Sequence, residues 1–221
     1  MMLIGGGVLT IVAYLLGSIP FGLVLTRLFT SIDVRKTGSG NIGATNVRRM
    51  AGNLLGFLTL LGDVLKGALP VLLTLALFWG EPREPAQAIT ACVAVAAFAG
   101  HLFPVYLGFK TGGKGVATAL GGCLVMAPLA VLFFLIIFVG VVKITRRVSA
   151  GSLAATAMLV PAVWFTTASV AYLAGSLAMA IFIFGRHRDN LKRLIAGTEP
   201  TLDKKRARAH LKAEGCAKGD L

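Results

Sequence analysis

"LLGFLTLLGDVLKGALPVLLTLALFW", residues 54–79, is followed by the polar stretch "GEPREP" and then by a second apolar run, "AQAITACVAVAAFAGHLFPVYL", residues 86–107. A helix needs about 20 apolar residues to cross the hydrocarbon core of a bilayer, and both runs reach that length. The pattern predicts a helical hairpin that crosses the membrane and returns.

The composition of the whole chain agrees with this hairpin. The 221 residues are 56% hydrophobic and only 14% charged, with a mean hydropathy of +0.82. A soluble domain of this length could not cover so much apolar surface, so we expect a polytopic membrane protein. The three cysteines have no spacing typical of a disulfide framework or a metal site. We expect no metal and no cofactor.

The net charge of +13 is distributed in a way that reports on orientation. Lys and Arg are retained in short cytoplasmic loops, so we interpret the clusters as cytoplasmic. Their positive charge predicts anionic lipids or anionic substrates as partners, and we expect no nucleic acid. An even number of crossings must then separate neighbouring clusters. The clusters are Arg27, Arg35, Lys36, Arg48 and Arg49; Lys110 and Lys114; Lys143, Arg146 and Arg147; and Arg186, Arg188, Lys192 and Arg193.

The later runs complete the count of spans. Residues 149–185 hold two spans with "FTTASVAY" as their outer turn. Residues 116–142 could form one long helix, but this would put "KITRR" outside. Two short helices broken near Ala127-Pro128 keep it inside, since Pro disfavours continuation of a helix. The first run has no basic region or cleavage site typical of a signal peptide, so we expect it to be retained as a span.

The expected fold is therefore an all-α integral membrane protein with seven transmembrane helices. Its amino terminus lies outside and its carboxyl terminus in the cytoplasm. Residues 1–200 form the membrane domain, and residues 201–221 form a basic cytoplasmic tail.

Three segments emerge together on the cytoplasmic side: "TGSGNIGATNVRR" (37–49), "FKTGGKGVAT" (109–118) and "GRHRDNLKRLIAGTE" (185–199). Each combines small residues or amides with Arg or Lys. Glycine lets backbone N–H groups converge on a phosphate, and a helix start adds free N–H groups. Gly108 to Lys114 also fits the spacing of a nucleotide-binding phosphate loop. However, Gly115 replaces the Ser or Thr that would hold Mg²⁺, so the segment suits a phosphate without metal or nucleotide.

Two further polar positions lie within the hairpin. Asp63 and Lys66 are i, i+3 neighbours, and we interpret them as a structural ion pair that braces the site. His101, near the inner end of the next span, is more typical of a packing or hydrogen-bonding residue than of a ligand.

The three segments, in order and in register, resemble the signature motifs of the bacterial acyl-phosphate glycerol-3-phosphate acyltransferases, the PlsY family. "LLGSIPFG" (15–22), "DVLKG" (63–67) and "SAGS" (149–152) are also similar, and the resemblance covers residues 10 to about 200. It implies an enzyme of the bacterial inner membrane with a cytoplasmic site. Such an enzyme transfers a fatty acyl group from acyl phosphate to the 1-hydroxyl of glycerol 3-phosphate, giving lysophosphatidic acid and phosphate for phospholipid synthesis.

The resemblance also implies site residues. Glycerol 3-phosphate is expected at the first and third motifs and acyl phosphate at the second, with Lys114, His187 and Asn190 as catalytic residues. The hydroxyl proton goes to His187 or to a substrate phosphate oxygen. A functional coupling to an acyl-phosphate-producing enzyme is a partner hypothesis. The matching positions are Ser39, Asn41, Thr45, Asn46 and Arg49; Gly112, Gly113, Lys114, Gly115 and Thr118; and His187, Asn190 and Glu199.

The sequence departs from the family pattern at one position. The usual pattern reads F-K-G-G-K-G, whereas Thr111 stands between Lys110 and Gly112 here. This extra residue creates the nucleotide-loop spacing, which we therefore interpret as accidental.

Two other functions compete with this one. A transporter of a phosphorylated solute would need an inverted repeat or a midplane site, and the polar residues gather at one face instead. A nucleotide-linked phosphotransferase needs acidic metal ligands, but Asp33 and Asp189 stand isolated.

Overall fold

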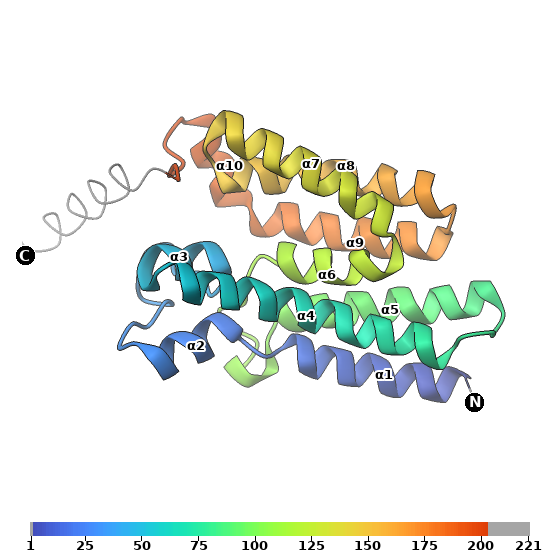
Figure 1. Ribbon diagram of the computed structural model, residues 1–221. Helices are drawn as coiled ribbons and strands as arrows, with labels where there is room; N and C mark the ends of the chain where they lie inside the picture. The colour runs from blue at the N-terminus through green and yellow to red at the C-terminus, as the bar shows by residue number, and fades with distance from the viewer. Residues whose placement is uncertain (1, 203–221) are drawn as a thin grey trace, which may run out of the picture.

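The computed structural model describes residues 2–202, and all regular secondary structure in this part of the chain is helical (Figure 1). The first six elements are α1 (Met2–Gly17), α2 (Phe21–Phe29), α3 (Ala44–Ala51), α4 (Asn53–Leu77), α5 (Arg83–Leu102) and the 3-10 helix η1 (Val105–Leu107). The others are α6 (Val116–Met126), α7 (Pro128–Thr145), α8 (Val148–Thr167), α9 (Val170–Arg186) and α10 (Arg188–Ile195).

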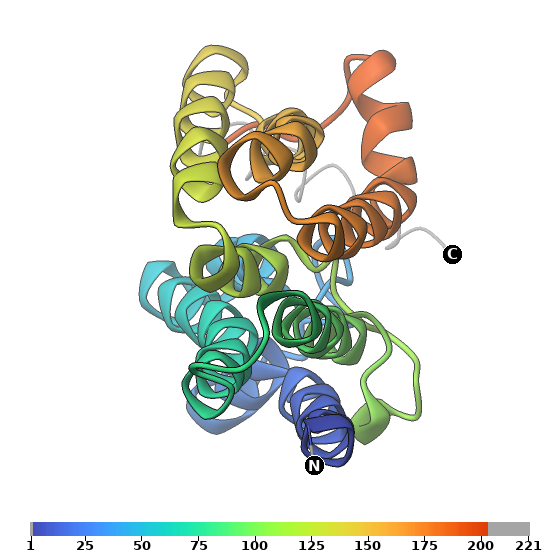
Figure 2. The same cartoon turned by 90° about the vertical axis from the view of Figure 1, so that its right-hand side faces the viewer.

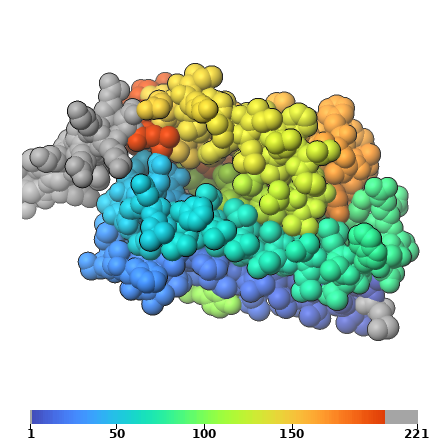
Figure 3. Space-filling view, viewed as in Figure 1, coloured from blue at the N-terminus to red at the C-terminus, as the bar shows by residue number. Residues whose placement is uncertain are grey.

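The long helices form two groups with one short helix between them. Helices α1 to α5 make one group and α7 to α10 the other, and α6 lies between the two (Figures 1 and 2). Helix α6 packs against α4 and α5 on one side and against α7 and α9 on the other. Between the α3–α4 surface and the surface of α7 runs a hollow (Figure 3). The position of α6 therefore relates the two groups to one another.

The helices have the length and composition of membrane spans. Five segments are long and apolar enough to cross: Met2–Phe29, Asn53–Leu77, Arg83–Leu107, Pro128–Thr145 and Val148–Thr167. A sixth is added if α9 and α10, which meet at a bend of 59°, form one span. Helix α6, with 11 residues, is about 16 Å long, roughly half the thickness of the hydrocarbon core. The all-helical, multi-pass fold is thus confirmed, while the number seven stays a prediction.

The predicted boundaries agree with the helices. Helix α6 ends at Met126 and α7 begins at Pro128, so the predicted break at Ala127-Pro128 is confirmed. The prediction of two short helices is wrong for α7, which has 18 residues and is long enough to cross a membrane. Proline is favourable at the first position of a helix because its missing N–H would have no partner there. Both predicted hairpins are also present, with turns between Leu77 and Arg83 and between Thr167 and Val170. The first run, in contrast, is divided into α1 and α2 on either side of residues 18–20.

Small residues bring the helices of the first group into backbone contact. A Cβ at Gly17 would lie 2.0 Å from the carbonyl oxygen of Ala97, and one at Gly121 would lie 2.0 Å from that of Val64. The first contact joins α1 to α5 and the second joins α6 to α4. Lipid gives helices no hydrophobic reason to associate, so close packing of small residues supplies much of the attraction.

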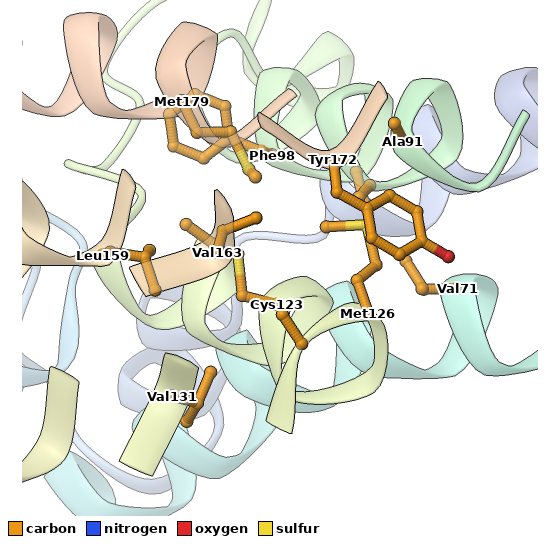
Figure 4. Close-up of a cluster of buried hydrophobic side chains, with 14 of the residues drawn as sticks. Val71, Ala91, Phe98, Cys123, Met126, Val131, Leu159, Val163, Tyr172 and Met179 are labelled. Atoms are coloured by element: carbon orange, nitrogen blue, oxygen red, sulfur yellow. The ribbon is translucent and has the colours of Figure 1, made fainter. Parts of the chain in front are cut away.

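Larger apolar side chains also pack around α6. Cys123 and Met126 of α6 lie with Val71 of α4 and Tyr172 of α9 in one buried cluster (Figure 4). Helix α6 is thus held by backbone contact with α4 and by side-chain packing that reaches both α4 and α9.

We expect Gly121→Ala to destabilise the protein by about 1–3 kcal/mol, because α6 must move away from Val64 to admit the methyl group. The matched control is Gly140→Ala in α7, where a Cβ would meet nothing within 4 Å. The control should be neutral or stabilising, since Ala favours helix more than Gly. Thermal unfolding in detergent measures both variants, and an equal loss of stability would contradict the role of the α4–α6 contact.

Candidate active site

The three motif segments lie at one end of the molecule. Helix α3 and the loop before it, the loop before α6, and the α9–α10 junction are all at the left in Figure 1, and the α4–α5 and α8–α9 turns are at the right. The segments belong to different helices, so their convergence is a property of the helix packing and not of the local sequence.

A chain of hydrogen bonds joins the second motif to the third. Lys114 Nζ donates to Asn190 Oδ1. The amide nitrogen of Asn190 in turn donates to Glu199 Oε1 over 2.6 Å. Asn190 and Glu199 are buried, so these bonds are little exposed to competition from water. They fix the position of Lys114 relative to α10.

Glu199 is the centre of this arrangement. Its carboxylate also accepts hydrogen bonds from Ser149 Oγ at 2.6 Å and from Arg193 Nε at 2.8 Å. Its backbone oxygen accepts from Arg147 Nε at 3.2 Å. Sequence reasoning assigned no role to Ser149 or Arg193. For Ser149 the only signal was the family-like "SAGS" at 149–152, since its spacing of 50 residues to Glu199 carries no local pattern. Arg193 lies within the third motif segment, six residues from Glu199.

The bond from Arg147 also bears on sidedness. It brings the α7–α8 turn, with its basic "KITRR", to the same end of the molecule as the third motif. This agrees with the prediction that a helix broken at Ala127-Pro128 returns the chain to the motif side.

Arg49 approaches the group from α3. Burial lowers the pKa of its guanidinium and the charge of Glu199 opposes this shift, with further lowering by Arg48 and Arg193. Within residues 2–202 the guanidinium makes no hydrogen bond or ion pair. It is therefore a cation in the site with its donors available to a ligand.

Two groups near Asn190 have altered pKa values. Burial lowers the pKa of Lys114 to about 8, and Glu199 counteracts part of this shift. Burial and the charge of Lys114 lower the pKa of His187 to about 4, so its imidazole is neutral at neutral pH. His187 Nδ1 lies 2.8 Å from the carbonyl oxygen of Ile183. A neutral imidazole donates to such a carbonyl through Nδ1–H, which leaves Nε2 as a proton acceptor.

In the first motif, Asn46 is occupied by its own loop. Its amide nitrogen donates to the carbonyl oxygens of Val34, Thr37 and Asn41, and its Oδ1 accepts from the N–H of Ser39. The sequence predicted Asn46 as a substrate ligand. In the structure, the polar groups of its side chain are already used to shape the loop. Asn41 Oδ1 likewise accepts from the N–H of Gly43 at the start of α3. Ser39 and Thr45 are exposed.

The glycines of the second motif pack against the end of α5. A Cβ at Gly112 would lie 1.8 Å from the carbonyl oxygen of Leu102, and one at Gly113 would lie 1.9 Å from His101 Nε2. Gly115 has φ +85°, in the left-handed region, and its α-carbon faces Phe98. These positions therefore exclude side chains for reasons of space and backbone conformation, in addition to any contact with phosphate.

Two threonines of this segment differ in surroundings. Thr118, in the first turn of α6, is buried and its hydroxyl has no hydrogen-bond partner. The additional Thr111 is exposed and has φ +55°, which is uncommon for a β-branched residue. A glycine would adopt this conformation without strain.

Comparison with known proteins agrees with the motif resemblance. The family model described as "Glycerol-3-phosphate acyltransferase" matches residues 7–197.

The chain belongs to the glycerol-3-phosphate acyltransferase family.

The glycerol-3-phosphate acyltransferase of Syntrophotalea carbinolica is 49% identical over 192 residues, covering 87% of this chain and 95% of the relative. That of Anaeromyxobacter dehalogenans is 51% identical over 196 residues, covering 88% and 96%. A solved structure of PlsY, an integral membrane glycerol 3-phosphate acyltransferase in its glycerol 3-phosphate form, superposes with a TM-score of 0.84 at 37% identity, covering 91% of this chain and 98% of that chain. Its lysophosphatidic acid form gives 0.82 at 36% identity, covering 92% and 98%.

The protein is therefore an integral membrane acyltransferase, and the family assignment favours this function over a transporter. Its structure brings together five of the residues singled out from the sequence: Lys114, Asn190 and Glu199 through hydrogen bonds, and Arg49 and His187 through electrostatic interaction.

We expect Glu199→Gln to lower acyltransferase activity about tenfold and to destabilise the protein by about 1–3 kcal/mol. Oε1 of Glu199 accepts from Ser149 and Asn190, and Oε2 accepts from Arg193. A glutamine that keeps its oxygen toward the first two donors turns its amide group toward Arg193, so the ion pair is lost. The control is Asp189→Asn in α10, whose exposed side chain is 4.0 Å from Arg188. Activity and melting temperature are measured for both, and a Glu199→Gln protein as active as the control would show that this carboxylate does not organise the site.

Proposed function

We propose that this acyltransferase moves a fatty acyl group from acyl phosphate to the 1-hydroxyl of glycerol 3-phosphate, giving lysophosphatidic acid and inorganic phosphate. The observation that supports this proposal most is the contact of the second and third motifs through Lys114, Asn190 and Glu199. The PlsY structures of the same fold are of glycerol 3-phosphate and lysophosphatidic acid forms, which supports the acceptor and the product.

The charges of the site suit two phosphorylated substrates. Three cations surround one carboxylate, Glu199. Arg193 donates a hydrogen bond to it, and Arg49 and Lys114 interact with its charge. This leaves an excess of two positive charges before any ligand binds. Fixed positive charge in a partly buried site also stabilises the negative charge that develops as phosphate leaves.

We assign the acyl phosphate to the second motif, with Gly112, Gly113, Lys114, Gly115 and Thr118 around its phosphate. The first turn of α6 offers unpaired N–H groups and the positive end of the helix dipole. The unpartnered hydroxyl of Thr118 lies in that turn. The N–H of Gly113 already donates to the carbonyl oxygen of His101, so we assign Gly113 to the shape of the loop.

We assign glycerol 3-phosphate to the first and third motifs. Arg49 binds its phosphate, helped by Ser39, Asn41 and Thr45, and His187 and Asn190 bind its hydroxyl groups. Asn190 does so through the amide hydrogen and the oxygen lone pair that Glu199 and Lys114 leave unused. Asn46, bonded to three backbone oxygens, and Glu199, bonded to three side-chain donors, hold these residues in place.

The reaction needs no covalent enzyme intermediate. The 1-hydroxyl oxygen attacks the acyl carbonyl carbon, the bond from that carbon to the phosphate oxygen breaks, and phosphate leaves with the electron pair. The hydroxyl proton goes to His187 Nε2 or to a phosphate oxygen of the substrate. Acyl phosphate is already activated, so positioning and electrostatics supply most of the rate.

The membrane arrangement belongs to the same proposal. We place the site at the cytoplasmic face of the bacterial inner membrane, with seven crossings, the amino terminus outside and the carboxyl terminus inside. Residues 1–200 are the membrane domain. Of the basic tail at 201–221, residues 203–221 lie outside the described residues. The gathering of the basic motifs at one end supports this orientation, and coupling to an enzyme that makes acyl phosphate follows from the donor.

A direct assay tests the donor and the acceptor. Purified protein is mixed with glycerol 3-phosphate and either acyl phosphate or acyl-CoA, and lysophosphatidic acid and phosphate are measured. Acyl phosphate alone should give both products in equal amounts. Product from acyl-CoA at a comparable rate would contradict the proposed donor.

In the same assay, Lys114→Ala should lose at least 100-fold in rate while keeping its melting temperature within a few degrees. The matched control is Lys110→Ala, an exposed lysine in the same loop, which should retain most activity. A normal rate of phosphate release by Lys114→Ala with glycerol 3-phosphate present would contradict the assignment.

The pH dependence follows from the pKa of Lys114, about 8. Only the protonated amine attracts phosphate, so kcat/KM should fall as pH rises through about 8, by about tenfold per pH unit above it. His187, with a pKa of about 4, remains neutral across this range. In Lys114→Arg the decline should disappear, because a guanidinium stays charged. A decline that persists in Lys114→Arg would assign it to another group.

A further inference from the structure

Beneath the second motif lies a buried charged cluster for which the proposed reaction has no use. Asp63 and Lys66 of α4 form an ion pair of 2.7 Å, with side chains only 3% and 2% exposed. The ion pair predicted from the sequence is thus confirmed. His101 Nδ1 of α5, 4% exposed, lies 3.4 Å from the same carboxylate oxygen, in electrostatic contact but without a hydrogen bond within the described residues. Ionisable residues inside a membrane protein are costly, so a cluster of three calls for a function.

The cluster links three parts of the fold. Lys66 Nζ also donates to the carbonyl oxygen of Ile19 over 2.8 Å, at the break between α1 and α2, where the same oxygen also accepts from the N–H of Phe21 at 3.1 Å. Asp63 stands between Lys66 and His101. The cluster therefore fixes the end of α5 relative to α4 and to the α1–α2 break.

The end of α5 in turn supports the glycine loop. The N–H of Gly113 donates to the backbone oxygen of His101 at 3.1 Å. The α-carbon of Gly113 lies against the imidazole, since a Cβ there would be 1.9 Å from Nε2 and 2.6 Å from Cε1. Gly113 is followed directly by Lys114. The imidazole is thus the surface on which the residue before the proposed phosphate-binding lysine rests.

We propose that His101, held by the Asp63–Lys66 pair, is a positioning residue for the acyl-phosphate subsite. Its ring sets the distance between the glycine loop and the end of α5. This in turn sets the distance from Lys114 and the first turn of α6 to the donor phosphate. The inference rests on the proposed assignment of acyl phosphate to this loop. Glycerol 3-phosphate, assigned to the other two motifs, does not depend on the ring.

A proton-transfer function fits these contacts less well. Lys66 is committed to Asp63 and to a backbone carbonyl, and the ring of His101 faces Asp63 on one side and the backbone of Gly113 on the other. None of these neighbours on the loop side takes up or releases a proton. A supporting contact with backbone is what the geometry offers.

The test compares His101→Phe with Thr59→Val. Phenylalanine keeps a flat ring but cannot interact with Asp63, so the loop should lose its fixed distance from the end of α5. We expect KM for acyl phosphate to rise about tenfold, with kcat and KM for glycerol 3-phosphate within about twofold, the signature of weakened binding of one substrate. Thr59, buried one turn from Asp63, bonds only to Leu55 of its own helix, and its replacement should change neither KM.

A double-mutant cycle between Gly113 and His101 covers the case in which His101→Phe does not fold. Gly113→Ala should raise KM for acyl phosphate in the presence of the imidazole, because the added methyl group presses on the ring. In a His101→Ala background, which removes the ring, the same change should cost at least fivefold less. Contacting residues show such non-additivity, and distant ones do not.

The outcomes separate this inference from the proposed function. If His101→Phe is folded and leaves KM for acyl phosphate unchanged, or if both KM values rise together, His101 does not position this subsite. Additive effects in the cycle would overturn the inference in the same way. If the unaltered protein makes no lysophosphatidic acid from acyl phosphate, it is the proposed function that fails.

Discussion

The backbone contact between α6 and α4 is the constraint on which the rest of the structure depends. Gly121 and Gly67 allow it, since a Cβ at either position would lie about 2 Å from a backbone oxygen of the other helix. Helix α6 is too short to be held by a long apolar stripe, so close van der Waals packing against α4 must supply the attraction between the two helices. The phosphate-suited loop is the start of this same helix. Hence the packing that joins the two groups of helices also sets the position of Lys114.

The second constraint is the balance of charge at the motif end. Glu199 is a single carboxylate that receives three side-chain donors, and it orients Asn190, which in turn receives Lys114. Without it, cations from α3, the loop before α6 and α10 would repel one another in a partly buried space. With it, they stay together and keep a positive excess for a ligand. The one negative charge of Glu199 is enough to hold the cations together but not enough to neutralise their positive charge.

The sequence predicted the features that depend on local composition. Apolar length predicted the helical hairpins, and Pro128 predicted the break after α6, because both act on the residues nearest to them. The sequence did not predict that α2 is separate from α1, since the apolar run continues through Pro20. Nor did it predict Ser149 as a partner of Glu199, because a contact between segments 50 residues apart leaves no pattern in one sequence. The contact of Arg193, six residues from Glu199, forms only when the chain folds back after α10. Asn46 was predicted as a ligand of glycerol 3-phosphate, but its backbone partners at 34, 37 and 41 arise only when the loop closes.

The glycines of the second motif show that one residue can have two structural reasons. From sequence, Gly112 and Gly113 suggest exposed N–H groups that cradle a phosphate. In the structure the N–H of Gly113 is already taken by His101, and both glycines lie against the end of α5. Thr111, at φ +55° and exposed, lies before this packed part, so the extra residue lengthens the loop where nothing presses on it and leaves the spacing from Gly112 to Thr118 unchanged.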